Sequence, residues 1–157
     1  MMDDFSLMQP SVSHRFSATF WFDHFPVPSL LDASFQHISG LSREMQVSAY
    51  SEGGENLRNR YFTGKVQHGS LVLERGVMLL TPLSIMFNRQ LLSGNVTYFN
   101  AVISVFDAAA LPLTNWLITK AIPVRWQTSD LDANSNNVLI NTLELRYQDM
   151  IPLGVNL

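Results

Sequence analysis

The sequence has no cysteine among its 157 residues. A disulfide framework, a zinc–thiolate site and a catalytic thiol are therefore excluded. No run of apolar residues approaches the roughly 18 that a membrane-spanning helix needs. The first residues, Met1 to Asp4, are acidic and no apolar core of a signal peptide follows them. We therefore expect neither a secretory signal peptide nor membrane anchoring.

Charged residues are also scarce. They make up 15% of the chain, against about a quarter in an average soluble domain, whereas hydrophobic residues make up 46%. The formal net charge of −3 gives no electrostatic reason to expect binding to nucleic acid or to a membrane surface. Arginine outnumbers lysine, which fits either a protein interface or a bias of lineage. A small domain with so few charges must hide its surface or share it.

Familiar catalytic motifs are missing too. The sequence has no Gly-x-Ser-x-Gly elbow and no Walker loop. Gly53 and Gly54 stand between Glu52 and Glu55, and carboxylates would repel a phosphate, so this segment is interpreted as a loop. Four histidines share no strand face and no helical spacing that would suit a metal: His14, His24, His37 and His68. We expect no enzymatic activity, no cofactor and no metal.

One polar cluster partly imitates a calcium-binding loop. Asp130, Asp132, Asn134 and Asn136 alternate as the early ligands of such a loop do. A calcium loop also needs glycine at its sixth position and glutamate at its twelfth, and those positions hold Ser135 and Asn141. A turn rich in aspartate and asparagine is the favoured interpretation of these residues.

The segment from Leu113 to Met150 predicts a β-hairpin. Apolar residues recur at even spacing on both sides of a polar turn at residues 128–137, which is typical of two strands with one buried face. We expect one face of the first strand to carry Trp116, Ile118, Ile122, Val124 and Trp126. On the second strand, Leu139, Leu143, Leu145 and Tyr147 alternate with Ile140, Thr142, Glu144 and Arg146.

Further strands are expected at residues 16–22, 34–39, 44–50, 57–63, 69–77 and 96–107. In the first, Phe16, Ala18, Phe20 and Phe22 form one face, and the prolines of residues 25–28 end it. The sum is seven or eight strands, which predicts a mainly β fold, an antiparallel β-barrel or sandwich. Residues 1–13 are expected to form a flexible arm, and residues 14–157 a single β domain.

One helix is expected, from Pro82 to Ser93. Thr81 is a good N-cap, proline is tolerated in the first turn, and Gly94 ends the helix. One apolar stripe contains Leu83, Met86, Phe87 and Leu91, and a second contains Ile85 and Leu92. Two stripes suggest a helix between its own sheet and another molecule, although full burial within one domain would give the same pattern.

Four stretches, in order, resemble the phage tail tube protein family, whose members also build the inner tubes of contractile injection systems. They are the "SGL" segment in residues 35–42, the "Y-x-E-G-G-x-N" loop of residues 50–56, the "G…L-x-L-x-R-G" strand of residues 64–76, and the closing hairpin. The hairpin resembles "W…A-x-P-x-x-W…L-x-A-x-x-N-x-V…L-E-L", with Trp116, Ala121, Pro123, Trp126 and then residues 131–145.

This resemblance implies a hexameric ring with a continuous inner β-barrel. Stacked rings would form a tube for DNA or effector passage, in contact with a sheath and with baseplate or spike proteins, in a virion tail or injection particle assembled in the bacterial cytoplasm. The family's Gly-Gly loop contacts an adjacent ring. The ring-stacking and interface candidates are therefore Glu52, Gly53, Gly54, Glu55 and Asn56, together with Ile85 and Leu92 of the helix.

Two other functions remain open. The apolar residues 78–83 and the long segment 26–31 depart from the family pattern, and would suit a baseplate-proximal ring that initiates the tube and joins it to the spike hub. A β-sandwich module that binds a ligand, with Trp21, Trp116 or Trp126 as a stacking platform, is the alternative from another class. Core packing of Trp116 and Trp126 is the favoured interpretation.

Overall fold

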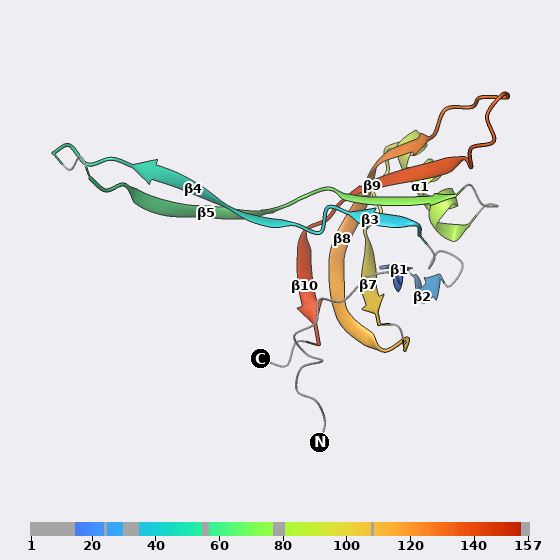
Figure 1. Ribbon diagram of the computed structural model, residues 1–157, viewed down its shortest axis with the longest axis horizontal. Helices are drawn as coiled ribbons and strands as arrows, with labels where there is room; N and C mark the ends of the chain where they lie inside the picture. The colour runs from blue at the N-terminus through green and yellow to red at the C-terminus, as the bar shows by residue number, and fades with distance from the viewer. Residues whose placement is uncertain are drawn as a thin grey trace, which may run out of the picture.

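The protein is described here from a computed structural model that covers residues 15–23, 25–29, 35–54, 57–76, 81–107 and 109–154. The described residues form ten strands and one helix, and all strand pairs are antiparallel (Figure 1). The elements are β1 (Arg15–Phe22), β2 (Phe25–Ser29), β3 (His37–Ser39), β4 (Arg43–Tyr50), β5 (Arg60–His68), β6 (Leu71–Gly76), α1 (Pro82–Ser93), β7 (Phe99–Phe106), β8 (Pro112–Thr128), β9 (Ile140–Arg146) and β10 (Asp149–Leu153). The expected mainly β class is confirmed.

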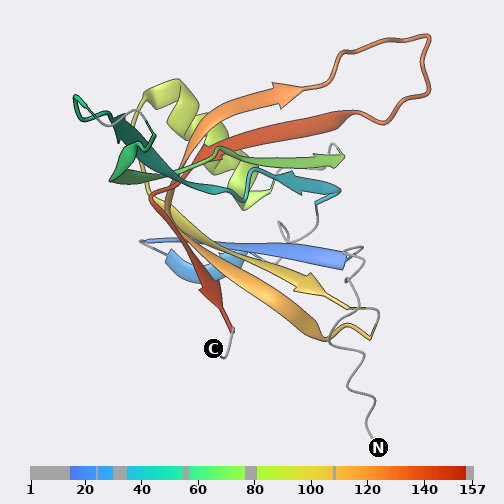
Figure 2. The same ribbon diagram turned by 60° about the vertical axis from the view of Figure 1, so that its left-hand side comes forward.

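Eight strands form one sheet that folds over on itself. Its order is β2-β1-β7-β8-β9-β6-β3, and β10 pairs with β8. The first half of the 17-residue β8 pairs with β7 and the second half with β9, so β8 belongs to both layers. Figure 2 shows β3, β6 and β9 in one layer and β1, β7 and β10 in the other. The predicted closing hairpin is confirmed as β8 and β9.

The hydrophobic core lies between the two layers. Ala18 and Phe20 of β1, Ala101 of β7 and Leu143 of β9 have no exposed surface at all. The aromatic rings of Phe20, Phe35, Phe99 and Phe87 contact one another through edge-on and tilted pairs with centroids 5.8–6.0 Å apart. The predicted faces of β1 and β9 are therefore confirmed, and β7 buries alternate residues in the same way.

Helix α1 has the predicted bounds because its ends are specified locally. Thr81 and Ser84 form a capping box, in which each side chain hydrogen-bonds the other's backbone N–H, and Gly94 ends the helix in a left-handed conformation. The Arg75 guanidinium donates to the Thr81 hydroxyl at 2.8 Å and ties the helix start to β6. No described helix is long and apolar enough to cross a membrane.

Several predicted strand boundaries are wrong. The prolines of residues 25–28 lie beyond the end of β1, as predicted, but they do not interrupt the sheet, because β2 forms there as an edge strand, where proline leaves no ladder partner unsatisfied. The strand expected at 57–63 begins later and continues through Gly64 to His68. The strand expected at 96–107 begins only at Phe99, and the strand expected at 69–77 spans Leu71–Gly76. β10 was not predicted at all.

The predicted single face of β8 is also wrong. Ile118 is buried, but Lys120 has a positive φ of 48°, and the next buried residue is Ala121 in place of Ile122. A second irregularity between Pro123 and Arg125 returns Trp126 to the core side. These two irregularities bend β8 between the layers, which is typical of bulges.

Candidate assembly surfaces

The β4–β5 hairpin projects away from the two-layered body (Figure 1). Every residue of β4 is exposed, and so is every residue of β5 before His68. The large apolar side chains include Val47, 59% exposed, and Tyr61, 65% exposed. A two-stranded hairpin with neither face covered is marginally stable in water. This arm therefore needs a surface that the described part of the chain does not supply.

The register gives the hairpin two different faces. Met45 pairs with Val66, Val47 with Thr63, and Ala49 with Tyr61. Partners directly opposite each other point to the same side of a strand pair, so these six residues form one surface, which we call the apolar face. The other surface, the polar face, carries Glu44, Gln46, Ser48, Tyr50, Arg60, Phe62, Gly64 and Gln67.

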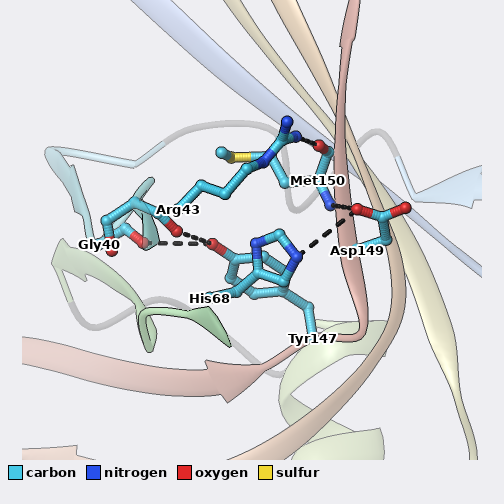
Figure 3. Close-up of polar contacts among 7 residues, drawn as sticks. Gly40, Arg43, His68, Tyr147, Asp149 and Met150 are labelled. Carbon is cyan, nitrogen blue, oxygen red and sulfur yellow. Dashed lines mark hydrogen bonds and ion pairs between the residues drawn. The ribbon is translucent and has the colours of Figure 1, made fainter. Parts of the chain in front are cut away.

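A cluster of polar side chains fixes the root of the hairpin (Figure 3). The Arg43 guanidinium donates to the carbonyl oxygen of Met150. His68 lies with its Nε2 3.6 Å from the Asp149 carboxylate, and its ring centroid is 5.1 Å from that of Tyr147. The Tyr147 hydroxyl is 3.4 Å from the carbonyl oxygen of Gly40, to which it donates. Burial raises the pKa of Tyr147. These contacts tie both hairpin strands to β10 and to the chain before it.

An open apolar groove lies beneath β3, between the two layers. It has a volume of about 560 Å³. Ile38 and Leu41 line it from one layer, and Phe16, Leu113 and Trp116 line it from the other. His37 and Gln36 are among its polar lining residues. The described residues therefore leave the sandwich incompletely closed along this side.

Helix α1 presents an apolar outer surface. Leu83 and Phe87 are buried, whereas Ile85 is 52% exposed and Leu92 is 87% exposed. The two predicted stripes are thus on opposite sides, and full burial of the helix within one domain is wrong. Leu91 of the predicted inner stripe is 43% exposed, because Gln90 points inward and donates to the carbonyl of Thr97.

The predicted ring-stacking residues lie at the tip of the hairpin. Glu52, Gly53 and Gly54 are exposed, and Glu52 forms a 3.3 Å ion pair with Arg60. Gly53 and Gly54 have open space around the position of a Cβ, and Gly54 has a φ of 103°. Glu55 and Asn56 lie outside the described residues. The tip and the helix surface are far apart in the fold (Figure 1), so the structure does not bring the five described candidates together.

The residues considered as ligands of a metal or as a stacking platform make contacts that stabilise the fold. The Asp132 carboxylate accepts a hydrogen bond from the Asn134 backbone at 2.9 Å, as in the favoured turn. The described residues contain no group of three or more His, Asp or Glu that could hold a metal. Trp116 and Trp126 are partly buried against the core, and Phe87 contacts Trp126 at 6.0 Å between centroids.

The hairpin faces and the groove were not predicted as sites. The strand expected at residues 44–50 does form, as β4, and in it Met45, Val47 and Ala49 alternate with polar residues. Sequence alone does not say whether such a face is covered within the chain or by another molecule, because that depends on where the hairpin lies relative to the body.

Residues 12–151 match the family model of the T4-like virus tail tube protein gp19. The chain belongs to this tail tube family. The resemblance seen in the sequence is thus confirmed, and the family is one of structural tube components. No curated protein sequence matches the chain.

Solved structures share the tail tube fold. The chain is 54% identical to a chain in the six-fold symmetrised cryo-EM structure of the anti-feeding prophage (AFP) baseplate, with a TM-score of 0.88 over 95% of this chain and 99% of that one. It is 21% identical to a chain in the sheath–tube complex of an extracellular contractile injection system, PVC (TM-score 0.78, 99% of both). It is also 21% identical to a chain in the AFP cap (TM-score 0.72, 92% and 91%). These last two likenesses show the fold alone.

Proposed function

We propose that this protein forms the ring of an inner tail tube that lies next to the baseplate of a contractile injection particle. The observation that carries the proposal is a contrast within one particle. Identity is 54% to a chain of the AFP baseplate and only 21% to a chain of the AFP cap. Because both chains come from the AFP particle, the contrast favours the baseplate end over the cap end.

Ring formation is supported by the surfaces that one chain leaves open. The hairpin, the groove and the outer side of α1 all expose apolar side chains, and a monomeric protein rarely leaves this much apolar surface uncovered. The baseplate relative comes from a six-fold symmetrised structure, which supports a hexamer. Closed rings are a common outcome of head-to-tail contacts between identical subunits.

The proposed role is structural, without catalysis. The ring would contact the adjacent tube ring through Glu52, Gly53, Gly54, Glu55 and Asn56 at the hairpin tip. Ile85 and Leu92 on the helix surface would face a second subunit or another protein of the particle, either sheath, baseplate or spike. Protein or DNA cargo would pass through the lumen without sequence-specific binding. Assembly would take place in the bacterial cytoplasm.

The alternative role within the tail tube is that of the main tube subunit, which forms many stacked rings. The PVC likeness supports it, because that chain comes from a sheath–tube complex and the fold agrees over the whole length. The two roles differ in copy number. A baseplate-proximal ring is present once per particle, whereas copies of a main tube subunit increase with tube length.

The test is to count this protein in purified particles by quantitative mass spectrometry, relative to a baseplate component of known stoichiometry. We expect about six copies, one ring's worth, whatever the tube length. An antibody to a C-terminal tag should bind only at the baseplate end. Copy numbers that rise in step with tube length, or labelling along the whole tube, would contradict the proposal and favour the main tube subunit.

A further inference from the structure

We propose that the groove beneath β3 receives the apolar face of the β4–β5 hairpin of an adjacent copy. Each subunit would then complete the core of its neighbour, and the ring would be closed by six such contacts. This inference rests on the proposed ring and adds the pair of surfaces that forms it.

The groove is an unfinished part of the core and not a polar binding site. Ile103, 1% exposed, belongs both to the core and to the groove lining, so the groove opens directly onto buried apolar residues. Leu113 at its margin is 46% exposed. An apolar occupant would remove this surface from water, which is the dominant favourable term in association.

The apolar face of the hairpin has a matching character and a suitable size. Its core of Met45, Val47, Ala49 and Val66 carries no charge. Its large side chains expose on the order of 400 Å², about half of what each partner of a standard interface buries. The groove volume of about 560 Å³ falls among pockets that enclose a ligand as large as several side chains.

The placement of the two surfaces favours a second copy as the occupant. Figure 1 shows the hairpin leaving the body on one side, whereas β1, β2 and β3 lie towards the other. The polar cluster at the root holds the hairpin away from its own groove through Arg43, His68 and Tyr147. A projection on one side and a receptor on the other give a head-to-tail contact, which closes into a ring when the rotation is right.

The chain lacks cysteine, so designed disulfides can test this contact directly. In the test protein, Val47→Cys is combined with Leu113→Cys, both at partly exposed positions. The matched control combines Ser48→Cys, the next residue and on the polar face, with the same Leu113→Cys. Both full-length proteins are assembled into rings, oxidised, and separated on non-reducing gels.

We expect the first pair to give a ladder of cross-linked species up to the size of the closed ring, and the control to give at least tenfold less. Rings that form normally but cross-link equally in both proteins, or in neither, would overturn the inference and leave the ring intact. The N-terminal segment of the same chain is the alternative occupant, so cross-linking of Leu113→Cys to Leu7→Cys within one chain, in assembled rings, would also overturn it. Failure of the unmodified chain to form rings, even with its baseplate partners, would instead contradict the proposed function.

Discussion

Gly40 is a position at the root of the hairpin where the backbone leaves no room for a side chain. It has a φ of 87°, a conformation that side chains with a Cβ rarely adopt. A Cβ at this position would overlap the backbone carbonyl oxygen of Ser70. Gly40 lies between β3 and β4, where the chain leaves the body, and Ser70 lies where the chain returns between β5 and β6. The close approach of these two segments requires glycine.

Replacing this glycine should destabilise the isolated subunit. We expect Gly40→Ala to lower the free energy of unfolding by at least about 2 kcal/mol, because strained φ and overlap with backbone act together. Urea unfolding followed by tryptophan fluorescence measures the change. Gly53→Ala is the control, because Gly53 has no positive φ and no atom lies within 4 Å of the place that an added methyl group would take. A Gly40→Ala variant as stable as Gly53→Ala would refute this account of the root.

Tyr147 should make subunit stability fall at alkaline pH. Burial of its hydroxyl raises the pKa above the ordinary value of 10.0. Because the unfolded chain then ionises first, this contribution is fully present below pH 10 and is lost as the pH rises through the raised pKa. We expect the difference in unfolding free energy between the natural protein and Tyr147→Phe to shrink above pH 10. A difference that stays constant from pH 8 to pH 11 would show that the hydroxyl is not desolvated.

At the scale of elements, local signals were predictable and register irregularities were not. Thr81, Pro82 and Gly94 specify both ends of α1 through caps that act within a few residues. The face of β8 changes because Lys120 adopts a positive φ, which nothing in its neighbouring sequence requires. β5 continues through Gly64, which faces Gln46 across the pair, so this glycine lies within the strand and does not end it.

Among the candidate surfaces, too, some were predictable from the sequence and others were not. Ile85 and Leu92 were found because a helix repeats every 3.6 residues, so two apolar stripes can be seen in the sequence. The groove beneath β3 was not found, because it brings together residues from β1, β3, β7 and β8 that only tertiary packing makes neighbours. The hairpin residues were found as a strand pair, but their exposure follows from the position of the hairpin outside the body.

Substitutions on the outer surface of α1 can separate effects on assembly from effects on subunit stability. Leu92 lies in the last turn of the helix, where no basic residue is present, and a cation there is favourable to the helix dipole. We expect Leu92→Lys to keep or slightly raise subunit stability, by up to about 0.5 kcal/mol, and Ile85→Lys to change it little.

Both substitutions should nevertheless weaken incorporation into particles, because each would bury a charge at an interface. A tagged variant is expressed together with the natural chain, and the assembled particles are isolated by pull-down. The ratio of variant to natural chain in these particles measures incorporation. Asn95→Lys, exposed just beyond the helix, serves as the control. Equal incorporation of Leu92→Lys and Asn95→Lys would exclude this surface from the assembly.

At the scale of the whole molecule, the few charges and the open apolar surfaces have one explanation. The described residues form a core between the layers that the groove leaves open on one side, and the hairpin, the groove and the helix surface all expose apolar side chains. If the apolar face of the hairpin packs on a neighbour, the polar face remains free to line the lumen. It carries Glu44, Gln46, Ser48, Arg60 and Gln67, which would give the channel wall mixed charge, beside the aromatic pair of Tyr50 and Phe62.

The most direct measurement is cryo-electron microscopy of the purified full-length protein at high concentration, alone and with its baseplate partners. We expect closed six-fold rings around a hollow axis, in which each β4–β5 hairpin lies against the next subunit. A monomer that persists under both conditions, with its hairpin folded back over its own groove, would contradict it.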